Sequence, residues 1–117
     1  MELAARIVVG LVAAIHFYIL VLEMFLWRTD RVRATFGTTE EFAEQSATLA
    51  ANQGLYNGFL ATGLVYGLTT DDLKFQVFFL CCVLVAGIYG ALTATRRILF
   101  VQAIPAAVAL LLVLLAY

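Results

Sequence analysis

The sequence predicts an all-α integral membrane protein, folded as an antiparallel four-helix transmembrane bundle. Apolar residues make up 64% of its 117 residues and charged residues only 13%. The mean hydropathy is +1.00, and a soluble domain of this size could not bury so much apolar surface. The apolar residues form four runs, each long enough to cross a bilayer as a helix of about 20 residues. We therefore expect one transmembrane domain over residues 1–117.

The first run is expected to form a retained membrane helix over residues 4–27. It is longer than the apolar part of a signal peptide, it contains two ionisable side chains, and no small-residue cleavage site ends it. The second helix is expected over residues 39–68. Gly37 breaks the chain before it, and Thr38 and Glu41 have the spacing of a capping box.

Two short polar loops, TTDDLK (69–74) and TRR (95–97), join the remaining helices, which are expected over residues 75–94 and 98–116. Short loops between long helices force neighbours to run antiparallel, which gives an up-down-up-down bundle. Pro105 in the last helix leaves a backbone carbonyl unpaired about one turn earlier. A kink there would widen a pocket between the helices.

The arginines predict the orientation of the chain in the membrane. Five of them lie in loops 28–46 and 95–97, whereas the opposite side carries only Arg6 and Lys74. Because positively charged loops stay in the cytoplasm, both arginine-bearing loops are expected inside and both termini outside. The expected location is a bacterial cytoplasmic membrane. The net charge of −1 and the absence of a basic run argue against a nucleic-acid partner.

Two ionisable side chains interrupt the first apolar run, HFYILVLEMFLW (16–27). Seven residues of helix advance about 10 Å and nearly two full turns, so His16 and Glu23 share one helix face at different depths. An ionisable group at membrane depth is costly and marks a functional site by default. Glu23 is therefore the first candidate catalytic residue and His16 the second, although a lone buried histidine is as often a packing residue.

Four polar side chains form one arc on the second helix, within LAANQGLYNGFL (49–60). They are Asn52, Gln53, Tyr56 and Asn57. Amides that faced lipid would lack hydrogen-bond partners, so the arc is expected to face inward and form a binding surface. Depth is counted inward from residue 27 of the first helix and from residue 47 of the second, where its apolar stretch 47–68 begins, at about 1.5 Å per residue. This count brings Glu23 level with Asn52 and Gln53. The same count brings His16 level with Tyr56 and Asn57.

The other two helices are expected to add polar groups to the same layer. The depth count places Tyr89 of the third helix and Gln102 of the fourth near Glu23. All four helices would then contribute a polar side chain to one pocket, with no metal site. The structural alternative is that these groups only hold the helices together, because interhelical polar bonds in membranes average about 0.6 kcal/mol.

Small residues at GxxxG spacing occur twice on the second helix, as Gly54/Gly58 and Gly63/Gly67. Such pairs let neighbouring helices approach closely. The two pairs lie on nearly opposite sides of the helix, so one is expected to pack within the bundle and the other, Gly63/Gly67, against another subunit. A homo-oligomer, either a dimer or a trimer, is therefore expected.

Four stretches of the sequence resemble one family. HFYILVLEMFLW, LAANQGLYNGFL, AGIYGALT (86–93) and VQAIPA (101–106) are similar to sequences of DUF1304, a family of small bacterial and fungal membrane proteins of unknown function. The resemblance covers essentially the whole chain, and its H-x6-E and NQGxYN motifs are fairly specific. It implies a four-span membrane protein whose polar positions are the signature of the family, and it implies no activity.

The polar residues allow functions from different classes. A carboxylate and an imidazole form the minimal pair for proton transfer, so an acid–base enzyme (isomerase-like) or a specific binder of a small lipophilic molecule is the first hypothesis. It needs no cofactor; haem held by His16 is a variant that no haem motif supports. The second is a proton-coupled exporter of small hydrophobic or cationic compounds that uses Glu23. The third is a lipid-binding or scaffolding role. The rich hydrogen-bonding arc favours the first.

Overall fold

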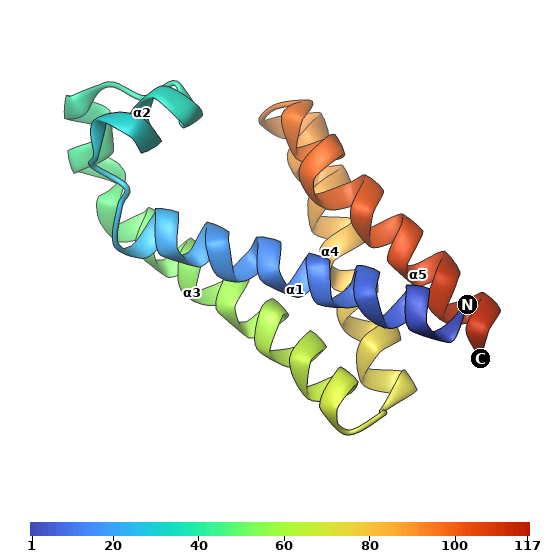
Figure 1. Cartoon of the computed structure of the whole chain (residues 1–117). Helices are drawn as coiled ribbons and strands as arrows, with labels where there is room; N and C mark the ends of the chain where they lie inside the picture. Colours follow the sequence, from blue (N-terminus) through green and yellow to red (C-terminus); the bar gives the residue numbers. More distant parts are fainter. The chain divides into compact units, whose positions relative to one another are not determined.

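The computed structural model describes all 117 residues, and every regular element in it is a helix (Figure 1). The elements are α1 (Glu2–Met24), α2 (Asp30–Phe36), α3 (Glu40–Thr69), α4 (Leu73–Thr93), the π-helix η1 (Leu99–Ala103) and α5 (Ile104–Ala116). The all-α prediction is confirmed. The four long helices begin and end within three residues of the predicted positions.

Three helical segments are long and apolar enough to cross a membrane. They are α1, α4 and the continuous segment Leu99–Ala116, which joins η1 to α5. α3 has 30 residues and is therefore long enough, but its amide and carboxylate side chains lower its hydropathy below that of the other three. The chain thus has the helices of an integral membrane protein, with α3 as the most polar of the long ones.

The short helix α2 is not among the helices predicted from the sequence. The hydroxyl of Thr29 caps its N-terminus by accepting a hydrogen bond from the N–H of Val32 at 3.4 Å. Gly37 ends it in the left-handed conformation, with φ at +69°. Glycine adopts this conformation without the steric cost that a side chain brings, so Gly37 is a helix-ending residue as well as a breaker.

α3 begins one residue later than the predicted capping box implies. Its first helical residue is Glu40, and the hydroxyl of Thr39 accepts a hydrogen bond from the N–H of Phe42 at 3.1 Å. The N-cap is therefore Thr39, and the capping box assigned to Thr38 and Glu41 is wrong. Adjacent threonines make both positions chemically able to cap, which is why spacing alone selected the wrong one.

The packing divides the chain into two compact units. One contains His16–Phe59 and the other contains Met1–Ile15 with Leu60–Tyr117. We call them the polar unit and the apolar unit, because the predicted arc and both ionisable residues of α1 lie in the first. The long helices α1 and α3 run from one unit into the other.

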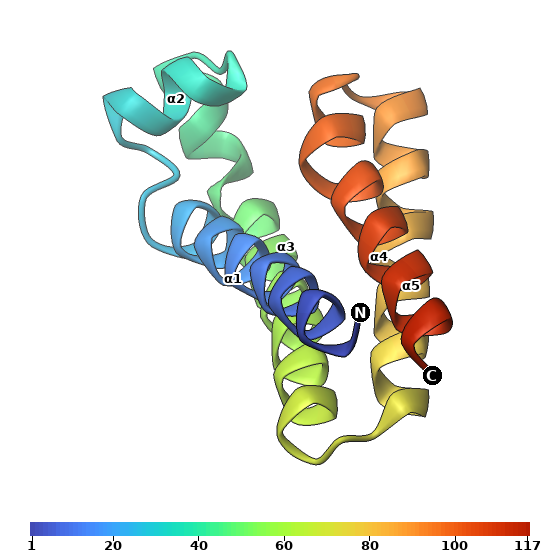
Figure 2. The same cartoon turned by 45° about the vertical axis from the view of Figure 1, so that its right-hand side comes forward.

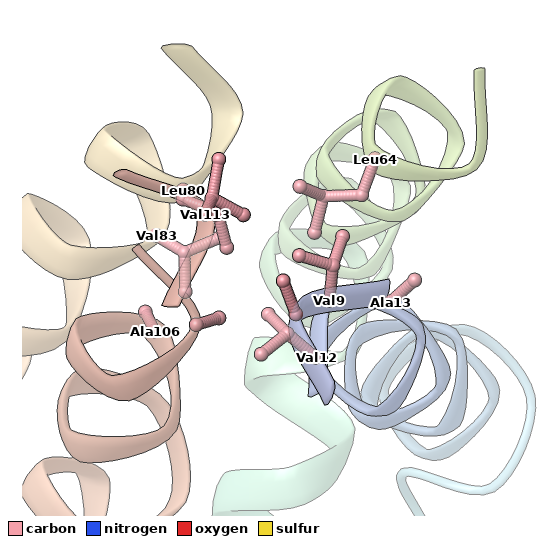
Figure 3. Close-up of a cluster of buried hydrophobic side chains, with 10 residues drawn as sticks. Val9, Val12, Ala13, Leu64, Leu80, Val83, Ala106 and Val113 are labelled. Atoms are coloured by element: carbon pink, nitrogen blue, oxygen red, sulfur yellow. The ribbon is translucent and has the colours of Figure 1, made fainter. Parts of the chain in front are cut away.

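The core of the apolar unit is built from small side chains contributed by α1, α3, α4 and α5 (Figure 3). Its buried members are Ala5, Val9, Val12, Ala13, Leu64, Leu80, Val83, Ala106, Ala109 and Val113. Larger apolar side chains lie outside: Phe78 is 63% exposed and Leu92 81% exposed. When lipid covers the surface of a protein, small residues are expected inside it and large apolar residues outside, as they are here.

Within the apolar unit, α4 and the segment η1–α5 lie side by side (Figures 1 and 2). Gly87 permits this approach, because a Cβ atom added to it would lie 2.8 Å from the backbone nitrogen of Ala103. η1 precedes Pro105, and its last turn is closed by a bond from the N–H of Ile104 to the carbonyl of Leu99. The distortion expected near Pro105 is therefore a π-helical turn.

Both ends of the chain lie at the same end of the apolar unit. The Tyr117 hydroxyl donates to the Glu2 carboxylate at 3.3 Å. The guanidinium of Arg6 forms an ion pair with Asp71 at 2.7 Å and donates to the carbonyl of Leu68 at 3.0 Å. Contacts between α1 and the α3–α4 loop therefore lie near the termini.

The Gly63/Gly67 pair packs inside the apolar unit. A Cβ atom added to Gly63 would lie 2.5 Å from the ring of Phe79, and one added to Gly67 would lie 2.9 Å from Cγ of Gln76. Gln76 is also fixed there, because its side-chain amide donates to the carbonyl of Gly67 at 3.1 Å. The expectation that this glycine pair faces another subunit is wrong, since α4 already covers it.

Candidate functional site

The site begins with two glycines that bring α1 and α3 together in the polar unit. A Cβ atom added to Gly54 would lie 2.7 Å from Cγ of Met24 and 3.1 Å from Cβ of Glu23. One added to Gly58 would lie 2.6 Å from Cδ1 of Leu20. The face of α3 that carries these glycines is therefore in direct contact with α1. A side chain that lies between the two glycines in sequence and next to this face also contacts α1.

Asn57 is that side chain, and it forms a hydrogen bond with Glu23. Its Nδ2 atom donates to Oε1 of Glu23 at 2.7 Å and to the backbone carbonyl of Gln53 at 3.1 Å. Both partners are acceptors, so the amide nitrogen must point toward them, which fixes the orientation of the amide. Asn57 is only 7% exposed. The carboxylate is thus held by a buried amide that is itself anchored to its own helix.

The partner of Glu23 differs from the two residues predicted for it. Asn52 and Gln53 lie one helical turn nearer the start of α3 than Asn57, and their side chains are exposed. The amide of Asn52 donates to the backbone carbonyl of Thr48 at 3.2 Å, within its own helix. The predicted meeting of Glu23 with Asn52 or Gln53 is therefore replaced by its bond with Asn57.

The predicted inward orientation holds for only one residue of the polar arc. Asn57 is buried, whereas Asn52, Gln53 and Tyr56 are exposed, Tyr56 at 58%. At about 100° per residue these four positions span about 140° of the helix, so one helix cannot cover them all. Asn57 is at the edge of the arc beside the glycine face, and only this edge contacts α1.

His16 is completely buried, at 0% exposure, at the boundary of the polar unit. It lies seven residues before Glu23 on α1 and makes a contact through its side chain or backbone. Tyr89 is 69% exposed on α4, and Gln102 is half-buried within η1. These last two belong to the apolar unit, so their meeting with Glu23 in one layer remains a prediction.

Trp27 was not among the site residues predicted from the sequence, but it joins the loop after α1 to α2 and α3 in the polar unit. Its indole N–H donates to the Ser46 hydroxyl at 3.1 Å, and its ring lies 5.0 Å from the ring of Phe36. The Ser46 hydroxyl in turn donates to the carbonyl of Phe42 at 2.6 Å. The sequence signal was present, because Trp27 lies one turn beyond Glu23 on the same side of the chain.

The chemistry available at this site is that of a carboxyl group with one positioned amide. A carboxyl group can give or take a proton. The amide N–H of Asn57, which donates to one carboxyl oxygen of Glu23, keeps that group in one orientation. No group of three or more His, Cys, Asp or Glu side chains lies close enough to hold a metal ion. Proton transfer or hydrogen-bonded binding at Glu23 is therefore the chemistry that the residues supply.

Comparison with known proteins places these residues in a family context. The chain is 32% identical over 96 residues to the uncharacterized protein YpaA of Lactococcus lactis subsp. lactis (strain IL1403), an alignment that covers 79% of this chain and 81% of that protein. No solved structure matches the chain. Residues 10–114 match the family described as "Protein of unknown function (DUF1304)". That match includes Glu23 and Asn57, and it extends over nearly all of the helical chain, which therefore belongs to the DUF1304 family.

Proposed function

We propose that this protein is a membrane-embedded acid–base enzyme, isomerase-like in its chemistry, that acts on a small lipophilic molecule. The observation that carries the proposal is the 2.7 Å hydrogen bond between Glu23 and the buried Asn57. An ionisable group in an apolar helix is costly, and here a glycine-lined contact and an anchored amide hold it in one geometry.

The two ionisable residues of α1 act at different positions along the substrate. His16 and Glu23 lie about 10 Å apart along the helix axis, which is too far for direct transfer of a proton. An elongated molecule lying along α1 would reach Glu23 directly, whereas His16 is fully buried and would be reached only after the side chains that cover it move aside. One group removes a proton from carbon and the other delivers a proton elsewhere, so the product is an isomer. The first group then loses its proton to water and the second regains one from water, which restores both groups.

The four long helices form a transmembrane bundle in this proposal, and α3 is its fourth span. α1, α4 and Leu99–Ala116 supply three apolar spans. α3 can cross beside them because part of its polar surface, at Asn57, is turned toward α1. In this proposal the positive-inside rule places the arginine-rich loops in the cytoplasm and both termini outside. The contact between Tyr117 and Glu2 supports placing the two termini on one side.

The proposed activity can be tested without knowing the substrate. Protein in liposomes is incubated in D2O with a lipid extract, and every lipid is followed by mass spectrometry. An isomerase that exchanges a proton with solvent should convert one compound into an isomer that carries one added deuterium. Sealed vesicles that accumulate a compound when a proton gradient is applied, without deuterium in any carbon position, would instead support the exporter with Glu23 as its proton carrier.

The exposed part of the polar arc supports a homo-oligomer as the working form. Asn52, Gln53 and Tyr56 are exposed on α3, and in a membrane such groups need hydrogen-bond partners. Amides both donate and accept, so the same arc on a second copy complements them. We expect native mass spectrometry in mild detergent to show a dimer or trimer, and Gln53→Leu to shift it toward monomer. Exclusive monomer for the wild type would contradict this expectation.

A further inference from the structure

A groove with a volume of about 490 Å³ opens in the polar unit where α1 ends. Its walls come from the end of α1 and the loop after it, and from the facing turns of α3. The lining residues are Met24, Phe25, Trp27, Arg28, Thr29, Ala47, Thr48 and Ala51. This volume falls within the range of about 300–1,000 Å³ that small-molecule sites occupy.

The lining is chemically divided. Met24, Phe25, Ala47 and Ala51 offer apolar surface, whereas Arg28 offers a guanidinium and Thr48 a hydroxyl group. The Thr29 hydroxyl also lines the groove, but its hydrogen is donated to the carbonyl of Leu26. An arginine guanidinium binds phosphate and carboxylate through several parallel N–H donors, and a threonine hydroxyl can donate to the same oxygens. A molecule that fits both parts carries an anionic head and an apolar chain.

Contacts within the polar unit hold the walls of the groove in place. Trp27 is fixed by its bond to Ser46 and by the ring of Phe36. The hydroxyl of Thr29 donates to the carbonyl of Leu26 at 2.7 Å, and the Arg33 guanidinium donates to the carbonyl of Arg28 at 3.3 Å. The groove is therefore formed before a ligand arrives, which lowers the entropic cost of binding.

The position of the groove suits an amphiphile in a membrane. α1 is one of the segments apolar enough to cross a bilayer, and it ends at Met24. Trp27 and Arg28 follow within one turn, which is the depth where aromatic and basic residues meet lipid headgroups. An anionic head held by Arg28 leaves its chain pointing along α1 toward the bilayer interior.

The groove adjoins the Glu23 site. Met24 forms part of the groove, and the position of a Cβ atom on Gly54 is 2.7 Å from its Cγ and 3.1 Å from Cβ of Glu23. Both Met24 and Glu23 therefore pack against the same glycine of α3. A chain that extends from the groove along α1 toward the start of the helix comes level with Glu23 first and then with His16.

We propose that this groove binds the anionic headgroup of an amphiphile, a phosphate or a carboxylate, and that such an amphiphile is the molecule presented to Glu23. The second half of this statement rests on the proposed function, whereas headgroup binding does not. Glu44 is the acidic group nearest the guanidinium of Arg28, at 3.9 Å, and both side chains are largely exposed. An exposed pair at this distance is weak, so an anionic ligand can replace it.

Trp27 supplies the measurement, because it lines the groove and is the only tryptophan of the chain. Protein in neutral detergent is titrated with dodecyl phosphate or with dodecanol, which has the same chain without the charge, and tryptophan emission is followed. Dodecyl phosphate should saturate the signal at far lower concentration. Native mass spectrometry counts the bound molecules independently, in case a substitution beside Trp27 changes its emission.

Three variants give the headgroup site a distinct signature. Arg28→Gln should weaken dodecyl phosphate binding by roughly tenfold, the loss of a charge-assisted contact. Glu44→Gln should tighten it by about two- to fivefold, since it removes a competitor. The matched control is Arg31→Gln, which makes the same charge change in the same region at a residue outside the groove and should leave affinity unchanged.

Nanodiscs identify the source of the headgroup. If bilayer phospholipid occupies the groove, phosphatidylglycerol discs should change the emission relative to phosphatidylcholine discs, and Arg28→Gln should remove the difference. If a free amphiphile occupies it, only added dodecyl phosphate should act in either disc. Equal binding of dodecyl phosphate and dodecanol, or equal losses in Arg28→Gln and Arg31→Gln, would overturn the headgroup site. The deuterium experiment tests the proton-transfer proposal separately: no deuterium incorporation together with intact binding that depends on Arg28 would contradict that proposal alone.

Discussion

Glu23→Gln should abolish deuterium incorporation, lowering its rate by at least about a hundredfold, while the protein stays folded. General acid–base groups contribute about 10²–10⁴ to a rate, and an amide cannot give or take the proton. Glutamine has nearly the same shape, and its side-chain oxygen can still accept the bond that Asn57 donates to Glu23 at 2.7 Å. The rate is measured in proteoliposomes, and folding by helicity and thermal unfolding in detergent.

The control for this substitution lies on the same helix. Glu2→Gln makes the same chemical change at the other end of α1, where the carboxylate accepts a bond from Tyr117, and it should leave the rate unchanged. A full rate in Glu23→Gln would show that the carboxyl group serves only to join α1 to α3. If Glu23→Gln does not fold, the carboxylate is needed for the stability of the protein rather than for catalysis.

Gly87→Ala should destabilise the protein by about 1–3 kcal/mol, the usual cost of forcing a methyl group into a packed interface. The new Cβ atom would lie 2.8 Å from the backbone nitrogen of Ala103 and 3.0 Å from its Cα. Backbone atoms cannot move aside as the end of a flexible side chain can, so α4 and the π-helical segment must separate. Thermal unfolding in detergent measures the loss.

Gly10→Ala is the matched control for Gly87→Ala. Gly10 is also a helical glycine in the apolar unit, but a Cβ atom added to it meets nothing within 4 Å. Alanine favours the helix over glycine by up to about 1 kcal/mol, so this variant should be as stable as the wild type or more stable. Equal destabilisation of both variants would contradict the packing account, because the helix preference of alanine is the same at both positions.

The long helices could be predicted from the sequence because apolar runs of about 20 residues have few alternatives in lipid. α2 could not be predicted from the same signal, because it has only seven residues and lacks an apolar run. Its boundary signals, Thr29 and Gly37, are visible in the sequence. Threonine and glycine are also common in turns, so these two residues alone do not predict a helix between them.

Glu23 was identified as a site residue by its cost in an apolar helix, but its partner was placed one turn away. The depth count aligned the predicted ends of the two apolar runs, but Glu23 bonds to Asn57, about one helical turn farther along α3 than Asn52 and Gln53. Counting from the true end of α1 at Met24 would pair Glu23 with a still earlier residue of α3, so helix ends do not give the register. The contact of Gly54 with Glu23 is a better guide to register than the helix ends, because close approach is possible only where a side chain is missing.

The π turn at Leu99–Ala103 sets the phase between the two parts of the last helical segment. A π turn holds one more residue than the α turn it replaces, so it is equivalent to a single-residue insertion in a helix. Removing that residue would restore continuous α-helical winding and rotate the preceding segment by about 100° relative to α5. The extra residue therefore determines which side chains before the π turn lie on the same face as those of α5.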